Sequence, residues 1–510
     1  MANTRYCFFD TETTNNVPNT GFTQLLEITA ILVDPETFEI EDILDEKCRL
    51  NKSTIFSPGA SFTNNLTEEN LRQNMSSYEL SKVISQKFNG WRQKYNIYWI
   101  AWNNNFDRGI FRVANAYMNL QLDDLYAMNT KSSSGNFNYE IDALSFAHAV
   151  KSFGKSDLKV PLHPKTGRPS FQLGLICEEN SIEAEGELHT AIVDTKLMMN
   201  FIKKYSREDP EIWSQMQKTS HKERVSDVLI NSKNYFLSTF FMRGNEYLYL
   251  YSFCGMGNDG SAIFVDLKNF NEDDFSLTPA EISKRIDDRK NRIFRKIYLN
   301  KNPILINPQA ANLSKEQINN LGDLTVIQKL HENLEGNNQF KNKILSAYNI
   351  DDEEIFAKKK SEYYEDMIYE SFFTSSDKSL AREFHQLSDY KDKYKKIKSF
   401  TDMRMVHIAK QIVYENEPTV MSQSDIKNME RQIADRLLGE GYDHRNKPNY
   451  STIASARMDL ENILTTYEID LDDLNNNNNS NPDLSKEKFQ TLVSSWSYIE
   501  EKERELEGIL

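Results

Sequence analysis

Residues 6–13 read YCFFDTET, an apolar run that ends in two acidic residues two positions apart. Side chains at positions i and i+2 of a β-strand point to the same side, so Asp10 and Glu12 are predicted to project together from the end of a buried strand. Neighbouring carboxylates raise each other's pKa unless a cation lies between them. Hard divalent ions such as Mg²⁺ take oxygen ligands of this kind. The alternative is a polar strand end that caps a following helix.

Two further apolar segments also run into polar residues. They are LLEITAILVD at 25–34 and NIYWIAWN at 96–103, the second followed by NNFD. Helical patterns lie between and after them, at 66–74, 78–95, 106–120 and 189–205. Strands that alternate with helices and end in polar residues predict a mixed α/β sheet with its site along one edge.

The remainder of the chain changes in character twice. Residues 235–267 are aromatic and β-branched with Gly and Asn turns, which predicts a small β-rich domain. Helical patterns follow at 278–293 and 314–349, and from about residue 352 the chain is charged and helical. The polar tract NNNNNSNPD at 475–483 predicts a flexible loop. With 510 residues, we expect three domains, at 1–205, 206–350 and 351–510.

Composition narrows the class of protein. Apolar residues make up 39% and charged residues 27% of the chain, which excludes wholesale disorder. The sequence has no apolar run near the roughly 18 residues of a membrane span and no secretory leader, so we expect no membrane association. The four cysteines are widely spaced and form no CxxC pair, which indicates free thiols in a reducing cytoplasm.

The net charge of −15 is unevenly distributed. Lys+Arg against Asp+Glu counts 20 to 25 in residues 1–205, 19 to 18 in 206–350 and 22 to 33 in 351–510. A basic run, KRIDDRKNRIFRKIYLNK, occupies 284–301. Contact electrostatics act within about a Debye length, so this run could line a groove for a nucleic acid. The alternative is a solvated helix face.

Two more clusters accompany the opening acidic pair. Asp107 follows the third strand, and His189 and Asp194 lie five residues apart on a helical segment. Positions i and i+5 are about 140° apart around a helix, so His189 is expected at the helix start and Asp194 within the helix. Four carboxylates and a histidine are what two-metal phosphodiester hydrolysis requires, with the histidine as the base.

These motifs resemble the DEDD exonucleases in the subgroup with a histidine base. The segments SPGASFTNNLTEENL (57–71), GRPSFQLGLICEENSIEAEGELHTAIVDT (167–195), FVDLKNF, IYLNKNPIL and YESFFTSSDK are similar to bacterial exonuclease I. The similarity covers nearly the whole chain, and proofreading subunits and ribonucleases of the wider family lack the later segments. The resemblance implies a ribonuclease H-like exonuclease domain, an SH3-like β-rich domain and a C-terminal helical domain around a groove.

The resemblance also implies roles for individual residues. Asp10, Glu12, Asp107 and Asp194 match the metal carboxylates, and His189 matches the general base. Substrate contacts are expected from six residues: Glu12, Asn103, Asn104, Arg168, Phe171 and Gln172. The family commonly has a basic residue where this chain has Gln172, and Arg168 is the candidate to supply the missing charge. The NNNFD stretch is also shorter than its counterpart in the family.

The leading hypothesis is a monomeric 3′→5′ exonuclease that degrades single-stranded DNA to 5′-mononucleotides in DNA repair and recombination, with two Mg²⁺ ions for which Mn²⁺ can substitute. The resemblance implies one protein partner, the acidic C-terminal tail of single-stranded DNA-binding protein. One alternative is a DEDD exoribonuclease that trims RNA 3′ ends, because the motifs alone do not separate the two substrates. The other is a nuclease fold that only binds nucleic acid.

Overall fold

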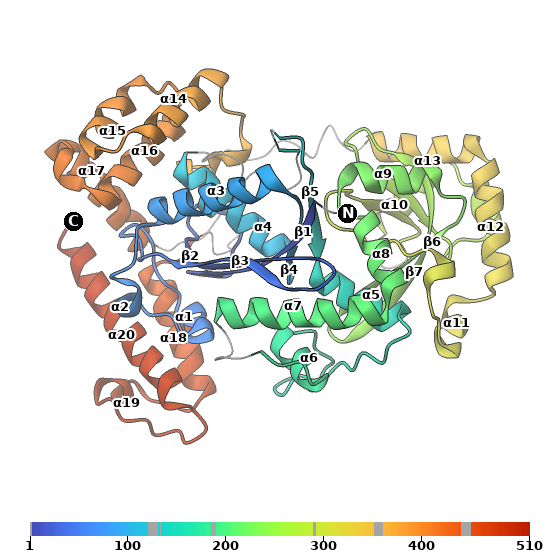
Figure 1. Ribbon diagram of the computed structural model, residues 1–510, viewed down its shortest axis with the longest axis horizontal. Helices are drawn as coiled ribbons and strands as arrows, with labels where there is room; N and C mark the ends of the chain where they lie inside the picture. The colour runs from blue at the N-terminus through green and yellow to red at the C-terminus, as the bar shows by residue number, and fades with distance from the viewer. Residues whose placement is uncertain are drawn as a thin grey trace.

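The computed structural model describes residues 3–120, 131–132, 134–184, 190–288, 292–350, 361–439 and 450–510. A mixed five-stranded sheet lies at the centre of the molecule, in the order β3-β2-β1-β4-β5 (Figure 1). Its strands are β1 (Thr4–Thr13), β2 (Leu25–Val33), β3 (Ile40–Lys47), β4 (Asn96–Ala101) and β5 (Asn138–Asp142). β1, β4 and β5 run parallel, and β2 and β3 pair antiparallel beside them. The mixed α/β sheet predicted from the sequence is confirmed.

Nine helices belong to the described part of this region. They are α1 (Pro58–Asn64), α2 (Glu68–Leu71), α3 (Ser77–Lys94), α4 (Asn105–Ile110), α5 (Ala143–Phe153), α6 (Leu173–Glu179), α7 (Ala191–Glu208), α8 (Pro210–Lys218) and α9 (Lys222–Asn231). Helix α3 begins at a capping box in which Ser76 and Glu79 bond each other's backbone N–H groups.

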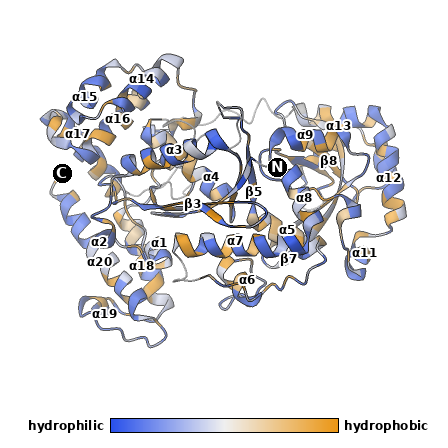
Figure 2. Cartoon of the chain, viewed as in Figure 1, coloured by the Kyte–Doolittle hydropathy of each residue, from blue (hydrophilic) through white to orange (hydrophobic). Residues whose placement is uncertain are grey.

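Side chains along β1 point alternately to the two faces of the sheet, and each face is covered by different helices. Phe8 packs with α5 and α7 on one face, and Phe9 packs with α3 and the α4 region on the other. Because Asp10 and Glu12 continue the Phe8 register, they lie on the face that α7 covers. Hydrophobic and hydrophilic residues alternate along α7, as expected for a helix with one face on a sheet (Figure 2).

A second sheet lies beside the first, in the order β6-β7-β8-β9, with all neighbours antiparallel. Its strands are β6 (Phe236–Met242), β7 (Asn245–Met256), β8 (Ala262–Asp266) and β9 (Phe294–Ile297). The helices that accompany it are α10 (Pro279–Asp287), α11 (Lys315–Leu321), α12 (Leu324–Gly336) and α13 (Asn338–Ile350). This is the predicted β-rich unit, on the right of Figure 1.

The last third of the described chain is helical, as predicted. Its helices are α14 (Ser375–Gln386), α15 (Tyr390–Lys396), α16 (Met403–Asn416), α17 (Gln423–Leu437), α18 (Ile453–Thr466), α19 (Leu471–Asn475) and α20 (Lys486–Glu507). α18 and α20 contact α1 of the first region, so the C-terminal helices lie against the central sheet region on the left of Figure 1. The domain boundaries at 205 and 350 stay predictions.

Two predicted helices differ from the structure, and three strands were not predicted. The helix expected at 106–120 is broken, because α4 passes into a π-helical turn (Phe111–Ala116) and a 3₁₀ turn (Tyr117–Asn119). The helix expected at 278–293 is shorter than predicted, because α10 ends at Asp287, and strand β9, which pairs with β8, begins at Phe294. Strands β3, β5 and β9 were not predicted.

The basic run 284–301 is therefore not one helix face. Arg285 pairs with Asp274 at 3.3 Å, and Lys296 pairs with Asp259 at 2.8 Å. Arg295 lies over the ring of Tyr249. Much of the charge of this run is engaged locally, and Arg289 lies outside the described residues. Across the described residues, none of the helices is both long and apolar enough to span a bilayer.

Candidate active site

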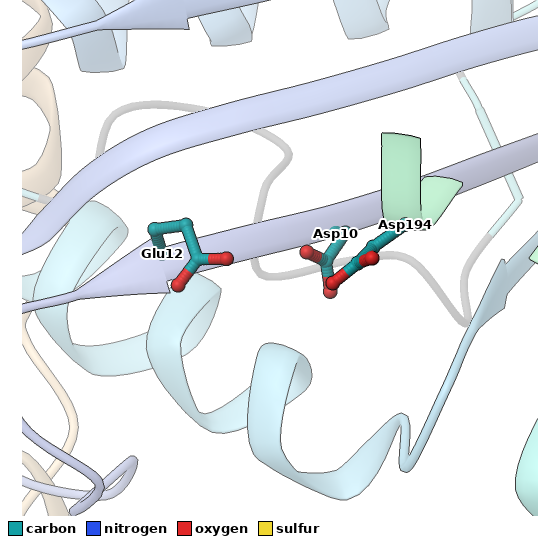
Figure 3. Close-up of side chains that lie close together, drawn as sticks. All are labelled: Asp10, Glu12 and Asp194. Carbon is teal, nitrogen blue, oxygen red and sulfur yellow. The ribbon is translucent and has the colours of Figure 1, made fainter. Parts of the chain in front are cut away.

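The end of β1 places Asp10 and Glu12 at the edge of the central sheet. The parallel pairing of β1 with β4 ends at Phe8 and Ile100, so that the two acidic residues extend beyond the end of β4. Asp194 lies in the first turn of α7, on the same face of the sheet. One carboxylate oxygen from each of Asp10, Glu12 and Asp194 lies within 4.8 Å of the others. Figure 3 shows the carboxylates of Asp10 and Asp194 side by side, with Glu12 further along β1.

The electrostatics of this cluster favour a bound cation. Burial, followed by the charges of Glu12, Asp107 and Asp194, raises the pKa of Asp10 well above its usual range. Burial, followed by the charges of Glu27 and Asp194, raises the pKa of Glu12 to about 8. Three half-buried carboxylates with all-oxygen donors fit a hard divalent ion, which would remove this repulsion.

Asp107 lies beside the cluster but is bonded differently. It is buried on α4, and its Oδ1 accepts a hydrogen bond of 2.7 Å from Thr11 Oγ1. Burial raises the pKa of Asp107 to about 7, although the bond from Thr11 opposes the shift. Asp107 is not among the three residues whose oxygens lie within 4.8 Å of one another, so its role as a fourth ligand stays a prediction.

His189, the predicted general base, lies outside the described residues. Its predicted neighbour Asp194 is placed as expected, because α7 begins at Ala191. Asn103 has a left-handed backbone conformation with φ 62°. Asn104 is buried, and its backbone N–H donates to Asp142 Oδ1 at 3.2 Å. The substrate contacts predicted for Asn103 and Asn104 stay predictions.

A cavity of about 800 Å³, here called the Asp194 cavity, opens beside the cluster. Its lining includes Asp194 together with Asn103, Arg168, Phe171 and Gln172, four of the predicted substrate contacts. Residues that the sequence analysis missed also line it: Trp102, His148, His163, Phe241 and Arg243. The structure therefore brings four of the six predicted contacts together beside the acidic cluster, whereas Glu12 and Asn104 do not line this cavity.

Aromatic side chains form one wall of the Asp194 cavity. The ring of Phe171 lies 4.4 Å from that of His148 and 4.7 Å from that of Phe241. Burial lowers the pKa of His148 to about 4, so its ring is neutral at pH 7 and packs as an aromatic group. Such a platform can stack nucleobases or other flat rings.

Two arginines reach the Asp194 cavity from the two sheets. Arg168 lies on the loop before α6, and Arg243 lies at the tip of the β6–β7 hairpin, followed by Gly244. Gly244 has φ +83°, and a Cβ there would lie 2.6 Å from Pro169 Cδ, so only glycine lets the hairpin approach the Arg168 loop this closely. Arg168 and Arg243 line the same cavity as Gln172, and the compensation of Gln172 by Arg168 stays a prediction.

A second cavity, of about 480 Å³, is lined by Glu12 and is here called the Glu12 cavity. Thr11, Asn15, Asn64 and Phe106 contribute from the sheet region, and Ser451, Ser455 and Asp459 contribute from the α18 region. The acidic cluster therefore faces two cavities, through Asp194 on one side and Glu12 on the other.

Glu27 is an electrostatic contributor that sequence analysis missed. It is directly opposite Glu12 in the β1–β2 pairing, is buried, and lies 3.3 Å from Lys47. The sequence feature that could have revealed Glu27 is its position as an acidic residue inside the apolar run LLEITAILV. Arg243 and Asp459 gave no comparable signal, because only the tertiary fold brings them to the cavities.

We expect the metal-free protein to lose stability as pH rises. Asp10, Glu12 and Asp107 have raised pKa values, with about 8 for Glu12 and about 7 for Asp107. Between about pH 4, where these acids ionise in the unfolded chain, and pH 8, the folded state holds more protons than the unfolded state. The free energy of unfolding therefore falls through this window, and Mg²⁺ should restore it most at the alkaline end.

Thermal melting with EDTA and with Mg²⁺, at about pH 5.5 and pH 8.5, checks this expectation. Asp10→Asn is the matched variant and should show a smaller alkaline loss than the wild type. Equal alkaline losses in the two proteins, or no effect of Mg²⁺ at pH 8.5, would contradict it.

Comparison with solved structures confirms the predicted fold class, a ribonuclease H-like mixed α/β sheet followed by a β-rich unit and a helical region. The particular fold is that of exonuclease I. E. coli exonuclease I in complex with a dT13 oligonucleotide superposes with a TM-score of 0.74 at 18% identity, over 98% of this chain and 100% of that one. A moderately thermophilic exonuclease I from Methylocaldum szegediense gives 0.73 at 16% identity, over 98% and 99%.

A zinc-bound form of the E. coli enzyme with single-stranded DNA gives a TM-score of 0.72 at 18% identity, over 98% and 99% of the two chains. No protein-family model and no curated protein sequence matches this chain. At these identities the likeness establishes the fold.

Proposed function

We propose that this chain is a metal-dependent 3′→5′ exonuclease that releases 5′-mononucleotides from single-stranded DNA. The observation that carries the proposal is the cluster of Asp10, Glu12 and Asp194, with oxygens within 4.8 Å, between two cavities at the sheet edge. The same fold in solved complexes of exonuclease I with single-stranded DNA supports it.

Asp10, Glu12 and Asp194 would hold divalent metal, with Asp107 as the fourth carboxylate. Two Mg²⁺ ions are the proposed cofactor, and Mn²⁺ is the proposed substitute. When bound, such a pair supplies positive charge to the scissile phosphate and to the leaving 3′-oxygen, and it lowers the pKa of a water. Thr11 holds Asp107 in one orientation through its hydroxyl. His189 accepts the proton of the attacking water.

The Asp194 cavity is the proposed path of the strand on the 5′ side of the scissile phosphate. Phe171 and Phe241 would stack bases, and Arg168 and Arg243 would contact phosphates. None of these contacts reads a base edge, so the proposed binding is independent of sequence.

We favour DNA over RNA as the substrate because solved structures with this fold are complexes with single-stranded DNA. The test is the Mg²⁺-dependent release of mononucleotides from 3′-labelled DNA and RNA strands of one sequence, measured side by side. The proposal predicts faster release from DNA. Equal or faster release from RNA would favour the exoribonuclease, since only a contact at the 2′-position separates the two substrates.

We expect Arg168→Gln and Arg243→Gln each to weaken strand binding and its salt dependence. A phosphate contact on a single strand releases a counterion, so each lost contact should lower the slope of log K against log salt by about 0.7. Titrations of fluorescent oligonucleotide binding across KCl concentrations measure the slope. Lys329→Gln is the matched control, because Lys329 lies on α12 and pairs with Glu272. Slopes equal to the wild type in both arginine variants would remove them from the strand path.

Four further features are proposed on the resemblance alone. They are a monomeric state, a cytoplasmic location, a role in DNA repair and recombination, and binding of the acidic tail of single-stranded DNA-binding protein. Gel filtration with light scattering tests the first, and calorimetric titration with a synthetic tail peptide tests the last.

A further inference from the structure

The Glu12 cavity is enclosed by parts of the chain that are far apart in sequence. β1 contributes Glu12, α1 contributes Gly59 and Asn64, and α18 contributes Asp459. At about 480 Å³, the cavity has the size of a small-molecule ligand site. The C-terminal helical region therefore forms one wall of a cavity that begins at the acidic cluster.

The two cavities differ in charge. Two arginines, Arg168 and Arg243, line the Asp194 cavity together with the carboxylates of Glu178 and Asp194, so it offers cations that can contact phosphates. In the described part of the chain, no lysine, arginine or histidine lines the Glu12 cavity, which instead contains the carboxylates of Glu12 and Asp459. A strand continues with further phosphates on the 5′ side of the scissile phosphate, whereas a 3′-terminal nucleoside carries no other phosphate. The charge difference assigns the terminal nucleoside to the Glu12 cavity.

Asp459 is held in place by α1. Its Oδ2 accepts hydrogen bonds from Ser57 Oγ at 2.6 Å and from the backbone N–H of Gly59 at 2.8 Å. A Cβ at Gly59 would lie 3.0 Å from the same oxygen. At the other end of α1, Asn64 donates a hydrogen bond to the Glu12 carboxylate. One short helix thus positions both carboxylates of the cavity.

We propose that Asp459 is a specificity-determining residue that restricts the enzyme to strands ending in a 3′-hydroxyl. A hydroxyl can donate a hydrogen bond to the Asp459 carboxylate, whereas a 3′-phosphate would bring like charge against it. This inference rests on the proposed exonuclease function. It assigns to the C-terminal helical region a part in recognising the end of the strand.

The test uses three otherwise identical single-stranded oligonucleotides that end in a 3′-hydroxyl, a 3′-O-methyl or a 3′-phosphate group. The wild type should discriminate most strongly against the phosphate, and the neutral 3′-O-methyl strand separates charge from size. In Asp459→Asn, which keeps an oxygen acceptor for Ser57 and Gly59, kcat/KM for the 3′-phosphate strand should rise about tenfold relative to the 3′-hydroxyl strand. Glu461→Gln is the matched control, because Glu461 is an exposed acid on α18 outside this cavity.

A second measurement uses only the wild type, so its result does not depend on whether the Asp459→Asn variant folds. Repulsion between charges is screened by salt, so discrimination against the 3′-phosphate should weaken as KCl increases, while that against the 3′-O-methyl group should not. A discrimination ratio within about twofold of the wild type in folded Asp459→Asn, or a ratio independent of salt, overturns the inference. Failure of the wild type to hydrolyse the 3′-hydroxyl strand would instead overturn the proposed function.

Discussion

Asp10→Asn and Asp194→Asn are each expected to reduce Mg²⁺-dependent release of mononucleotides to below about one thousandth of the wild-type rate. Each substitution removes one of the three carboxylates whose oxygens lie within 4.8 Å of one another. The metal charge that stabilises the transition state is lost with them. Single-turnover assays with 3′-labelled oligonucleotides measure the effect.

Folding and strand binding should survive both substitutions. The charge of Asp194 contributes to the raised pKa of Asp10 and of Glu12, so neutralising one carboxylate relieves repulsion. The melting temperature of the metal-free variants should therefore equal or exceed that of the wild type. Glu39→Gln removes an exposed carboxylate ahead of β3 and is the matched control, with unchanged activity. Normal turnover by either cluster variant at matched Mg²⁺ would reject the assignment of the cluster.

His189→Asn is expected to lower the rate by about 10²- to 10⁴-fold, the usual effect of losing a positioned general base. The acidic limb of the pH–rate profile should disappear, while metal affinity changes little. Exogenous imidazole should restore part of the rate in His189→Ala, because a small base can occupy the vacated position. An unchanged pH profile in His189→Asn would indicate that the residue is not the general base.

The strands that were predicted from the sequence are those with strong apolar patterns. β1, β2 and β4 are nearly continuous apolar runs because they are covered on both faces. β3 was missed because it is a largely exposed edge strand with the sequence IEDILDEK. β9 was not predicted because FRKI carries no strand pattern, and its pairing with β8 became visible only in the fold.

Part of the acidic cluster could be predicted from the local sequence alone. The two-residue spacing of Asp10 and Glu12 places both on one side of a strand, and that inference holds at any strand end. Asp194 required knowledge of the helix that covers this side. Arg243 and Asp459 could not be found from the sequence, because they come from a hairpin tip and a distant helix that only tertiary packing brings to the two cavities.

The polarity and metal dependence of cleavage test the central claim most directly. One single-stranded oligonucleotide is labelled at the 5′ end in one sample and at the 3′ end in another, and the products are followed with Mg²⁺ and with EDTA. The account predicts that the 3′ label appears as a mononucleotide from the earliest times, that the 5′-labelled strand shortens one nucleotide at a time, and that EDTA stops both. Early release of a 5′-labelled mononucleotide, internal fragments as first products, or hydrolysis in EDTA would contradict it.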